Sequence, residues 1–296
     1  MFELPKLAAR GRIKSPVFIV PHNDEFDMPE GHTIHRLVRD HTKAFAGQKL
    51  IVDSPQGRFE EEAALLTGRK LKNVFAHGKH LFYEWSPGRG SRAGVNLVHV
   101  HLGLYGKFRL HKNPAPEPRG AVRVRMIGTE KTLDLNGPTR CEILSKADFQ
   151  KLFDRLGQDP LKSDADPEIV WNRISKSRAA IGTLLLNQSV IAGLGNIYRA
   201  EILFLLGIHP EQPGSSLSRE QFDQLWKLSV DLLAIGVRYN RIITVDLSQA
   251  GKPASRLKRD ERLLVYKKTR CTECNAKIRK WALGARTMYA CEICQK

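Results

Sequence analysis

The sequence predicts an α+β protein with a β-rich N-terminal part, a helical middle part and a C-terminal metal-binding hairpin. Up to about residue 153, short runs of alternating apolar and polar residues are separated by glycine and proline, as is typical of β-strands. After residue 166, longer amphipathic stretches follow helix N-cap signals, and the last 26 residues contain two Cys-x-x-Cys pairs. With 296 residues, 42% of them hydrophobic, the chain can bury a substantial core and form about two domains.

The N-terminal part is expected to begin with a helix over residues 33 to 45. In this helix Ile34, Leu37, Val38 and His41 would share one face, which is the pattern of an amphipathic helix. Seven strands are expected after it, over residues 49–53, 70–75, 80–85, 96–101, 107–110, 121–127 and 132–135. Runs this short and frequent indicate a β-rich domain.

The helical part is expected to follow a polar hinge at residues 156–167. Asp166 and Pro167 can serve as the N-cap and the first residue of a helix. Ser218 and Gln221 have the spacing of a capping box in front of another amphipathic helix. Between them we expect a buried helix over the apolar run 181–191, a turn, and a helix over residues 197–206.

Neither membrane insertion nor secretion is expected. The uncharged run 181–198 contains three glycines and several side-chain amides, which favours a buried helix and a turn over a membrane span. The apolar stretch 16–21 is too short for the core of a secretory signal. We therefore expect a cytoplasmic protein, associated with the nucleoid if the cell is prokaryotic.

A glycine-rich turn, residues 192–198 (AGLGNIY), lies at the start of the helix expected over 197–206. Its glycines permit a tight connection, and free backbone amides at a helix N-terminus could face a phosphate, with Asn196 adding a side-chain donor. In the alternative reading the glycines serve only the geometry of a turn between two helices. The turn by itself does not decide between these readings.

The two cysteine pairs predict a structural zinc site. Cys271, Cys274, Cys291 and Cys294 have the spacing of two knuckles that place four thiolates around one Zn²⁺. The alternatives are a pair of disulfides or a redox-active Cys-x-x-Cys, but cysteines of a reducing cytosol stay available for metal. Arg279, Lys280 and Arg286 would lie on a two-stranded ribbon within this finger, where they suit contact with phosphate.

The charge of the chain indicates a polyanionic partner. It carries 48 Lys and Arg against 31 Asp and Glu, a net charge of +17. Residues 251–296 alone contain 13 Lys or Arg and 4 Asp or Glu. A basic solvated tail is the alternative, but a metal site in the same stretch favours nucleic acid.

Four motifs in a fixed order give the chain a family resemblance. They are residues 28–33 (MPEGHT), 78–81 (GKHL), 193–196 (GLGN) and the four-cysteine finger. Together they resemble the formamidopyrimidine-DNA glycosylase and endonuclease VIII family of base-excision repair enzymes, over residues 28 to 296. The resemblance implies a catalytic β-sandwich domain over 28–157, a helix-two-turn-helix domain over 158–264, a zinc finger over 265–296, and an N-terminal extension over 1–27.

The resemblance also implies the catalytic residues. Pro29 would be the nucleophile, because in the family this proline is the mature N-terminus and its amine attacks C1′ of the damaged nucleotide to form an iminium. An α-amino group has a pKa of about 8, so a useful fraction is neutral, and the cationic iminium then drives β- and δ-elimination. Glu30 would be the general acid and base, and Lys79 would bind phosphate and assist proton transfer.

Four further residues would contact damaged DNA. Asn196 and Arg286 would hold the phosphates that flank a flipped nucleotide. Leu104 and Tyr105 would fill the gap that the flipped base leaves, although Gly103 stands where relatives carry a larger polar residue. The alternative for Leu104 and Tyr105 is a β-turn whose side chains pack in the core.

The opening motif and the GKHL turn resemble the endonuclease VIII branch, which favours oxidised pyrimidines. We therefore expect a monomeric bifunctional DNA glycosylase and abasic-site lyase. Thr33 and Asn187 stand where family members usually carry acidic residues. Residues 1–27 matter more, because an acylated proline nitrogen is not nucleophilic. The alternative is a damaged- or structured-DNA-binding protein without catalysis, if the extension stays attached to Pro29.

Overall fold

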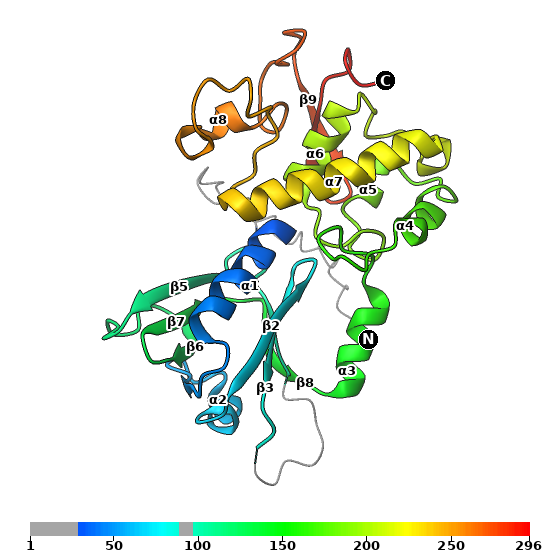
Figure 1. Cartoon of the computed structure of the whole chain (residues 1–296). Helices are drawn as coiled ribbons and strands as arrows, with labels where there is room; N and C mark the ends of the chain where they lie inside the picture. Colours follow the sequence, from blue (N-terminus) through cyan, green and yellow to red (C-terminus); the bar gives the residue numbers. More distant parts are fainter. Residues whose placement is uncertain (1–28, 89–96) are drawn as a thin grey trace, which may run out of the picture.

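The computed structural model describes residues 29–88 and 97–296. It consists of a β-sandwich and a helical part that carries a C-terminal hairpin (Figure 1). This arrangement confirms the predicted α+β class and the order of its three parts. The N-terminal extension lies outside the described residues.

The sandwich is made of two antiparallel four-stranded sheets, with the orders β1-β6-β7-β5 and β2-β3-β4-β8. The strands are β1 (Ile51–Asp53), β2 (Leu71–His77), β3 (His80–Trp85), β4 (Leu97–His101), β5 (Lys107–Lys112), β6 (Val122–Ile127), β7 (Lys131–Asn136) and β8 (Arg140–Leu144). All seven predicted strands are present, with ends that differ by at most two residues; residue 96 lies outside the described residues. The main core lies between the sheets.

One strand and two helices of this part were not predicted. Strand β8 lies at a sheet edge and is mostly half-exposed, so its sequence lacks a clear alternation of apolar and polar residues. Helix α2 (Glu60–Leu66) starts with three glutamates, which favour the positive N-terminal end of a helix. Helix α3 (Lys146–Arg155) is capped by Ser145 and covers the outer face of the second sheet.

Helix α1 (Gly31–Phe45) connects the sandwich with the helical part. It starts two residues before the predicted helix and lies between the sheets and α7 (Figure 1). Ile34 and Phe45 are buried in the sandwich core, and the predicted apolar face is confirmed. His41 lies within this face, where its Nδ1 is 2.7 Å from the Tyr83 hydroxyl.

The helical part is built around a buried central helix, α6. Its helices are α4 (Pro167–Ile174), α5 (Ile181–Leu184), α6 (Asn196–Leu205), α7 (Arg219–Tyr239) and α8 (Arg259–Arg262), with short 3-10 helices at Gly214–Ser216 and Ala254–Arg256. Asp166 caps α4, and the capping box of Ser218 and Gln221 begins α7, as predicted. The buried helix expected in the run 181–191 is present but covers only the first four residues of the run. It ends as the short α5, because Asn187 accepts a hydrogen bond from Ser189 N (3.0 Å) in a local turn that competes with helix.

The C-terminal ribbon pairs β9 (Arg279–Leu283) with β10 (Arg286–Ala290) in antiparallel register. This confirms the predicted two-stranded ribbon. Met288 and Ile278 are buried in the same hydrophobic core as the helices. The finger is therefore packed on the helical part rather than held by its cysteines alone.

A buried carboxylate in the hinge joins the two parts. Asp159 Oδ2 accepts a hydrogen bond from Gly78 N (2.7 Å). The same oxygen lies 2.7 Å from His35 Nε2 on α1. Nearby, His77 Nε2 is 2.7 Å from the Gly157 carbonyl oxygen. These contacts fix the end of the β2–β3 hairpin against the helical part. Among the residues placed by the structure, no helix has the length and apolar character needed to cross a membrane.

Candidate active site and metal centre

Glu30 is the centre of the candidate site. Its side chain is buried, with the residue 1% exposed, against the N-terminus of α6. Oε2 accepts a hydrogen bond from Gly195 N (2.8 Å) and Oε1 accepts one from Ile197 N (2.9 Å). The prediction that these amides are free to face a phosphate is therefore wrong, since an internal carboxylate occupies the helix N-terminus.

The glycines of the turn before α6 are needed for this close approach. A Cβ at Gly195 would lie 2.3 Å from Cδ of Glu30, which is far inside van der Waals contact. Gly31 N also donates to the Gly193 carbonyl oxygen (2.8 Å), and a Cβ at Gly31 would lie 2.8 Å from Cα of Gly193. The glycines thus serve geometry, as in the alternative reading, but their geometry holds Glu30.

Glu30 and Lys79 form an electrostatic pair in the same place. Burial raises the pKa of the Glu30 carboxyl, while the charge of Lys79 and the α6 amides act in the opposite direction. Burial lowers the pKa of Lys79, which the Glu30 charge opposes and the Arg286 charge reinforces. Two groups whose burial favours their neutral forms are suited to exchange protons with a substrate.

Lys79 is held by a two-residue hairpin turn between β2 and β3, as predicted. Gly78 in this turn has a φ of +57°, and a Cβ there would lie 2.8 Å from the Ala192 Cβ. The turn therefore packs directly on the glycine-rich segment that holds Glu30. Together with the bond from Gly78 N to Asp159, this packing places Lys79 at the boundary between the sandwich and the helical part.

Pro29 is half-buried and directly precedes Glu30 at the start of α1. Because Glu30 and Lys79 interact through their charges, the residue next to Pro29 lies near Lys79. The three residues come from two local elements: Pro29 and Glu30 directly precede α1, and Lys79 lies in the β2–β3 turn.

Asn196 and Arg286 are brought together by the start of α6 and the start of β10. Asn196 Nδ2 donates to the Thr287 carbonyl oxygen (3.0 Å), so part of its amide is used within the protein. Its Oδ1 accepts from Arg199 Nε (3.0 Å). Arg286 is exposed, and its carbonyl oxygen accepts from Arg199 Nη2 (3.4 Å).

Sequence reasoning missed Arg199. This guanidinium is fully buried and also donates to the carbonyl oxygens of Gly182 (2.8 Å) and Leu283 (3.0 Å). The available signal was an arginine within a mostly apolar helix, because a buried charge requires several partners. Arg279 on β9 was expected to suit phosphate contact, but its guanidinium is 2.7 Å from Glu292 Oε1.

Leu104 and Tyr105 lie on the turn between β4 and β5. They are 44% and 72% exposed, so the alternative in which both pack in the core is wrong. Gly103 has a φ of +66°, and a Cβ at this position would lie 1.8 Å from the Thr139 hydroxyl. A larger residue at position 103 would therefore adopt a strained backbone conformation and force the Thr139 side chain to move.

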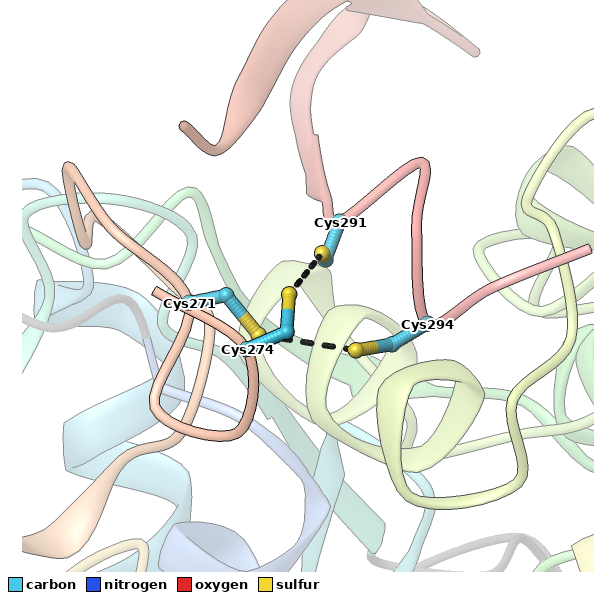
Figure 2. A group of neighbouring side chains, drawn as sticks. All are labelled: Cys271, Cys274, Cys291 and Cys294. Carbon is cyan, nitrogen blue, oxygen red and sulfur yellow. Dashed lines mark hydrogen bonds between the residues drawn. The ribbon is translucent and has the colours of Figure 1, made fainter. Parts of the chain in front are cut away.

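The four cysteines of the finger lie together, as Figure 2 shows. Their sulfurs are all within 4.8 Å of one another, and none forms a disulfide. The Sγ–Sγ distances are 3.8 Å between Cys271 and Cys294 and 3.5 Å between Cys274 and Cys291. Such separations are too long for a disulfide, so the predicted ligands form a possible site for one metal ion.

Comparisons with known proteins define the family. The formamidopyrimidine-DNA glycosylase N-terminal domain matches residues 28–142, and the formamidopyrimidine-DNA glycosylase H2TH domain matches residues 156–247. Endonuclease 8 1 of Mycobacterium tuberculosis (strain ATCC 25618 / H37Rv) is 44% identical over 274 residues, which cover 90% of this chain and 100% of that protein. Formamidopyrimidine-DNA glycosylase of Pasteurella multocida is 26% identical over 276 residues, covering 91% and 99%.

Solved structures agree with the sequence comparisons. A complex of wild-type Lactococcus lactis Fpg with DNA that contains N7-benzyl-Fapy-dG has a TM-score of 0.74 and 26% identity, over 90% of this chain and 100% of that one. A complex of the same Fpg with abasic-site DNA has a TM-score of 0.73 and 27% identity, over 90% and 99%. The fold is that of a DNA base-excision repair protein. The chain belongs to the formamidopyrimidine-DNA glycosylase and endonuclease VIII family.

Proposed function

We propose that this chain is a bifunctional DNA glycosylase and abasic-site lyase of base-excision repair, with oxidised pyrimidines as preferred bases. The observation that carries the proposal is the buried Glu30 carboxylate, seated on the α6 amides beside Pro29 and within the field of Lys79. The relative with 44% identity is an endonuclease 8, which supports that branch of the family. We place the protein in the cytoplasm, acting on DNA as a monomer.

The catalytic roles follow from the chemistry of the three residues. A free Pro29 nitrogen would attack C1′ of the damaged nucleotide, displacing the base and leaving a cationic iminium. Glu30, whose pKa burial raises, would donate a proton to the sugar ring and later accept one. Lys79 would bind a phosphate and assist the proton transfers during elimination.

Damaged DNA would lie across the boundary between the sandwich and the helical part. Arg286 is exposed there, and Asn196 lies beside it at the start of α6, with its side chain bonded to the Thr287 carbonyl oxygen and to Tyr266. Both would contact phosphates next to the flipped nucleotide. Leu104 and Tyr105, exposed on their turn, would fill the space that the base leaves.

The metal is proposed to be one structural Zn²⁺. With Zn–S bonds of about 2.3 Å, a tetrahedron of sulfurs has edges of about 3.8 Å. The Sγ–Sγ distances of 3.8 Å between Cys271 and Cys294 and 3.5 Å between Cys274 and Cys291 are close to this edge length. Four thiolates leave no open position for water, so the ion would order the finger rather than take part in catalysis.

The proposed domain boundaries remain residue 157 for the sandwich, residue 264 for the helix-two-turn-helix part and residue 265 for the start of the finger. The proposed active form begins at Pro29, either because translation starts at Met28 or because the extension is removed. The family match that begins at residue 28 supports this form. A small residue after an initiator methionine favours removal of that methionine.

Borohydride trapping tests the proposal directly. Protein beginning at Pro29 should become covalently linked to DNA that carries an abasic site or an oxidised pyrimidine. The chain 1–296 should not be trapped, because its Pro29 nitrogen is an amide. Equal trapping by both forms would remove Pro29 from the mechanism and would point to a lysine amine such as Lys79. If neither form excises a base or incises an abasic site, the non-catalytic DNA-binding alternative is correct.

A further inference from the structure

Three histidines and a glutamate lie together on the outer face of the second sheet, away from the sandwich core. His80 belongs to β3, His99 and His101 to β4, and Glu142 to β8. The register places Glu142 opposite His99 and His101 opposite His80. None of the proposed steps of base removal uses these four residues.

Glu142, His99 and His80 form one continuous hydrogen-bonded chain, which we name the imidazole chain. Glu142 Oε1 is 3.1 Å from His99 Nδ1, and His99 Nε2 is 2.8 Å from His80 Nδ1. A carboxylate can only accept, so His99 carries its proton on Nδ1 and its Nε2 accepts from His80 Nδ1–H. Nε2 of His80 is then left without a proton, as an acceptor.

The surroundings keep these imidazoles neutral. Burial lowers the pKa of His80 to about 2 and that of His101 to about 4, and it also lowers the pKa of His99, which Glu142 opposes. Several cations and one more imidazole face the cluster. Each of them disfavours a positive charge on the histidine rings. They are His77 from β2, Arg140 from β8, Arg155 from α3 and Lys79 from the β2–β3 turn.

The imidazole chain runs from solvent to the residue that follows the Lys79 turn. Glu142 has a 39% exposed side chain at one end, whereas His99 in the middle is 1% exposed. His80 at the other end directly follows Lys79, and its ring centroid is 4.9 Å from that of His101. His101 in turn ends β4, just before the turn of Leu104 and Tyr105.

We propose that Glu142, His99 and His80 form a proton relay between the Lys79 turn and solvent, which serves the strand-cleaving reaction. The proposal rests on the proposed function, in which protons must leave a site whose acid, Glu30, is buried. His80 Nε2 takes a proton at the Lys79 turn and His80 Nδ1 gives its own to His99 Nε2. His99 Nδ1 then gives its proton to the Glu142 carboxylate, which releases it to water. Both rings end neutral in the opposite tautomer. When the site later takes up a proton, Glu142 passes one from water to His99 Nδ1, His99 Nε2 gives its own to His80 Nδ1, and His80 Nε2 releases one to the site, which restores the first tautomers.

The first test measures strand incision of abasic-site DNA at saturating concentration, with protein that begins at Pro29. Glu142→Gln keeps an oxygen that accepts from His99 but cannot take up its proton. It should slow incision about tenfold without changing affinity for an abasic-site duplex. His99→Phe replaces the imidazole, which stacks on Phe82 with centroids 5.1 Å apart, by a ring that cannot carry a proton. It should slow incision at least as much.

The matched control is Glu84→Gln. Glu84 lies on the same face of β3 with a 34% exposed side chain and pairs with Lys72 instead of a histidine. This variant should incise at the rate of the parent. A Glu142→Gln variant as fast as the parent would overturn the relay, whatever His99→Phe does.

Two measurements separate a relay from a structural effect. In mixtures of H₂O and D₂O, the incision rate of the parent should depend on deuterium content along a curve, and that of Glu142→Gln along a straight line. Nitrogen NMR of the full chain should show His80 and His99 protonated on Nδ1; a proton on Nε2 of His80 would contradict the relay. A parent that does not incise at all would overturn the proposed function, whereas active parent and equally active variants would overturn only the relay.

Discussion

At the scale of single residues, the position of Glu30 combines two opposing influences on one carboxyl. Burial favours its neutral, proton-donating form, while the α6 amides and Lys79 favour the carboxylate. A residue that must donate and later accept a proton needs access to both forms. The balance comes from neighbours that are far away in the sequence, since Gly195 and Ile197 are the amide donors.

We expect Glu30→Gln, in protein that begins at Pro29, to reduce base removal by about 10² to 10⁴. Glutamine keeps the size of the side chain but lacks the ionisable proton. It can also satisfy only one of the two α6 amides through its oxygen, so the free energy of unfolding should fall by about 1–3 kcal/mol. Affinity for an abasic-site duplex should stay close to that of the parent. Excision at the parental rate with weakened binding would show that Glu30 is not the acid.

At the scale of elements, α6 organises the candidate site. Its N-terminal amides hold Glu30, Asn196 contacts the Thr287 carbonyl, and Arg199 bonds the backbone at both ends of the β9–β10 turn. One buried helix thus fixes the position of the carboxylate relative to the basic hairpin. This arrangement predicts that disturbances of the hairpin affect DNA binding before they affect the fold of the sandwich.

The sequence was sufficient for elements with strong local signals. Alternation located seven strands, and the caps at Asp166 and Ser218 located α4 and α7. It was not sufficient for partners set by tertiary contacts. Nothing near the glycine-rich turn indicates that its amides bind Glu30, and nothing near Arg199 indicates which carbonyls it meets. The resemblance placed Pro29, Glu30 and Lys79 together, whereas composition and spacing alone did not.

Loss of the hairpin charge or of the metal should weaken DNA binding at the element scale. Arg286→Ala should weaken binding to damaged and undamaged duplexes alike and reduce the salt dependence by about one unit of slope. Metal chelation should also weaken binding, because the two knuckles that flank the ribbon lose the ion that holds them together. Both effects are measured by titration of duplexes at several salt concentrations, and added Zn²⁺ should restore the chelated protein.

Arg279→Ala is the matched control for Arg286→Ala, since it removes the same charge from the partner strand. Its guanidinium is engaged with Glu292, so we expect a smaller loss of affinity. Equal losses from the two substitutions would mean that the hairpin acts only through its net charge. Unchanged affinity after complete metal removal would contradict a role of the metal in ordering the hairpin.

At the scale of the whole molecule, several histidines are buried as neutral groups. Burial lowers the pKa of His32 and of His41 to about 3, well below the ordinary value of 6.5. His32 packs between α1, α6 and α7, with its ring at 5.4 Å from that of Tyr198, whereas His41 packs against the sandwich. The two residues lie on one helix, but His32 stays buried only while the helical part is folded and His41 only while the sandwich is folded.

The free energy of unfolding should therefore fall as the pH is lowered from about 6.5 toward 3. In this range the unfolded chain binds protons at His32 and His41 that the folded chain does not, which costs about 1.4 kcal/mol per pH unit for each. The raised pKa of Glu30 acts in the opposite direction, because the folded state then holds a proton that the unfolded state loses. Urea denaturation of the chain 1–296 between pH 7 and pH 4.5 measures the net slope.

His41→Leu should make that slope shallower by about 1.4 kcal/mol per pH unit, although it removes the bond to Tyr83 and lowers stability at pH 7. Parallel pH dependence in parent and variant would show that His41 is protonated in the folded protein.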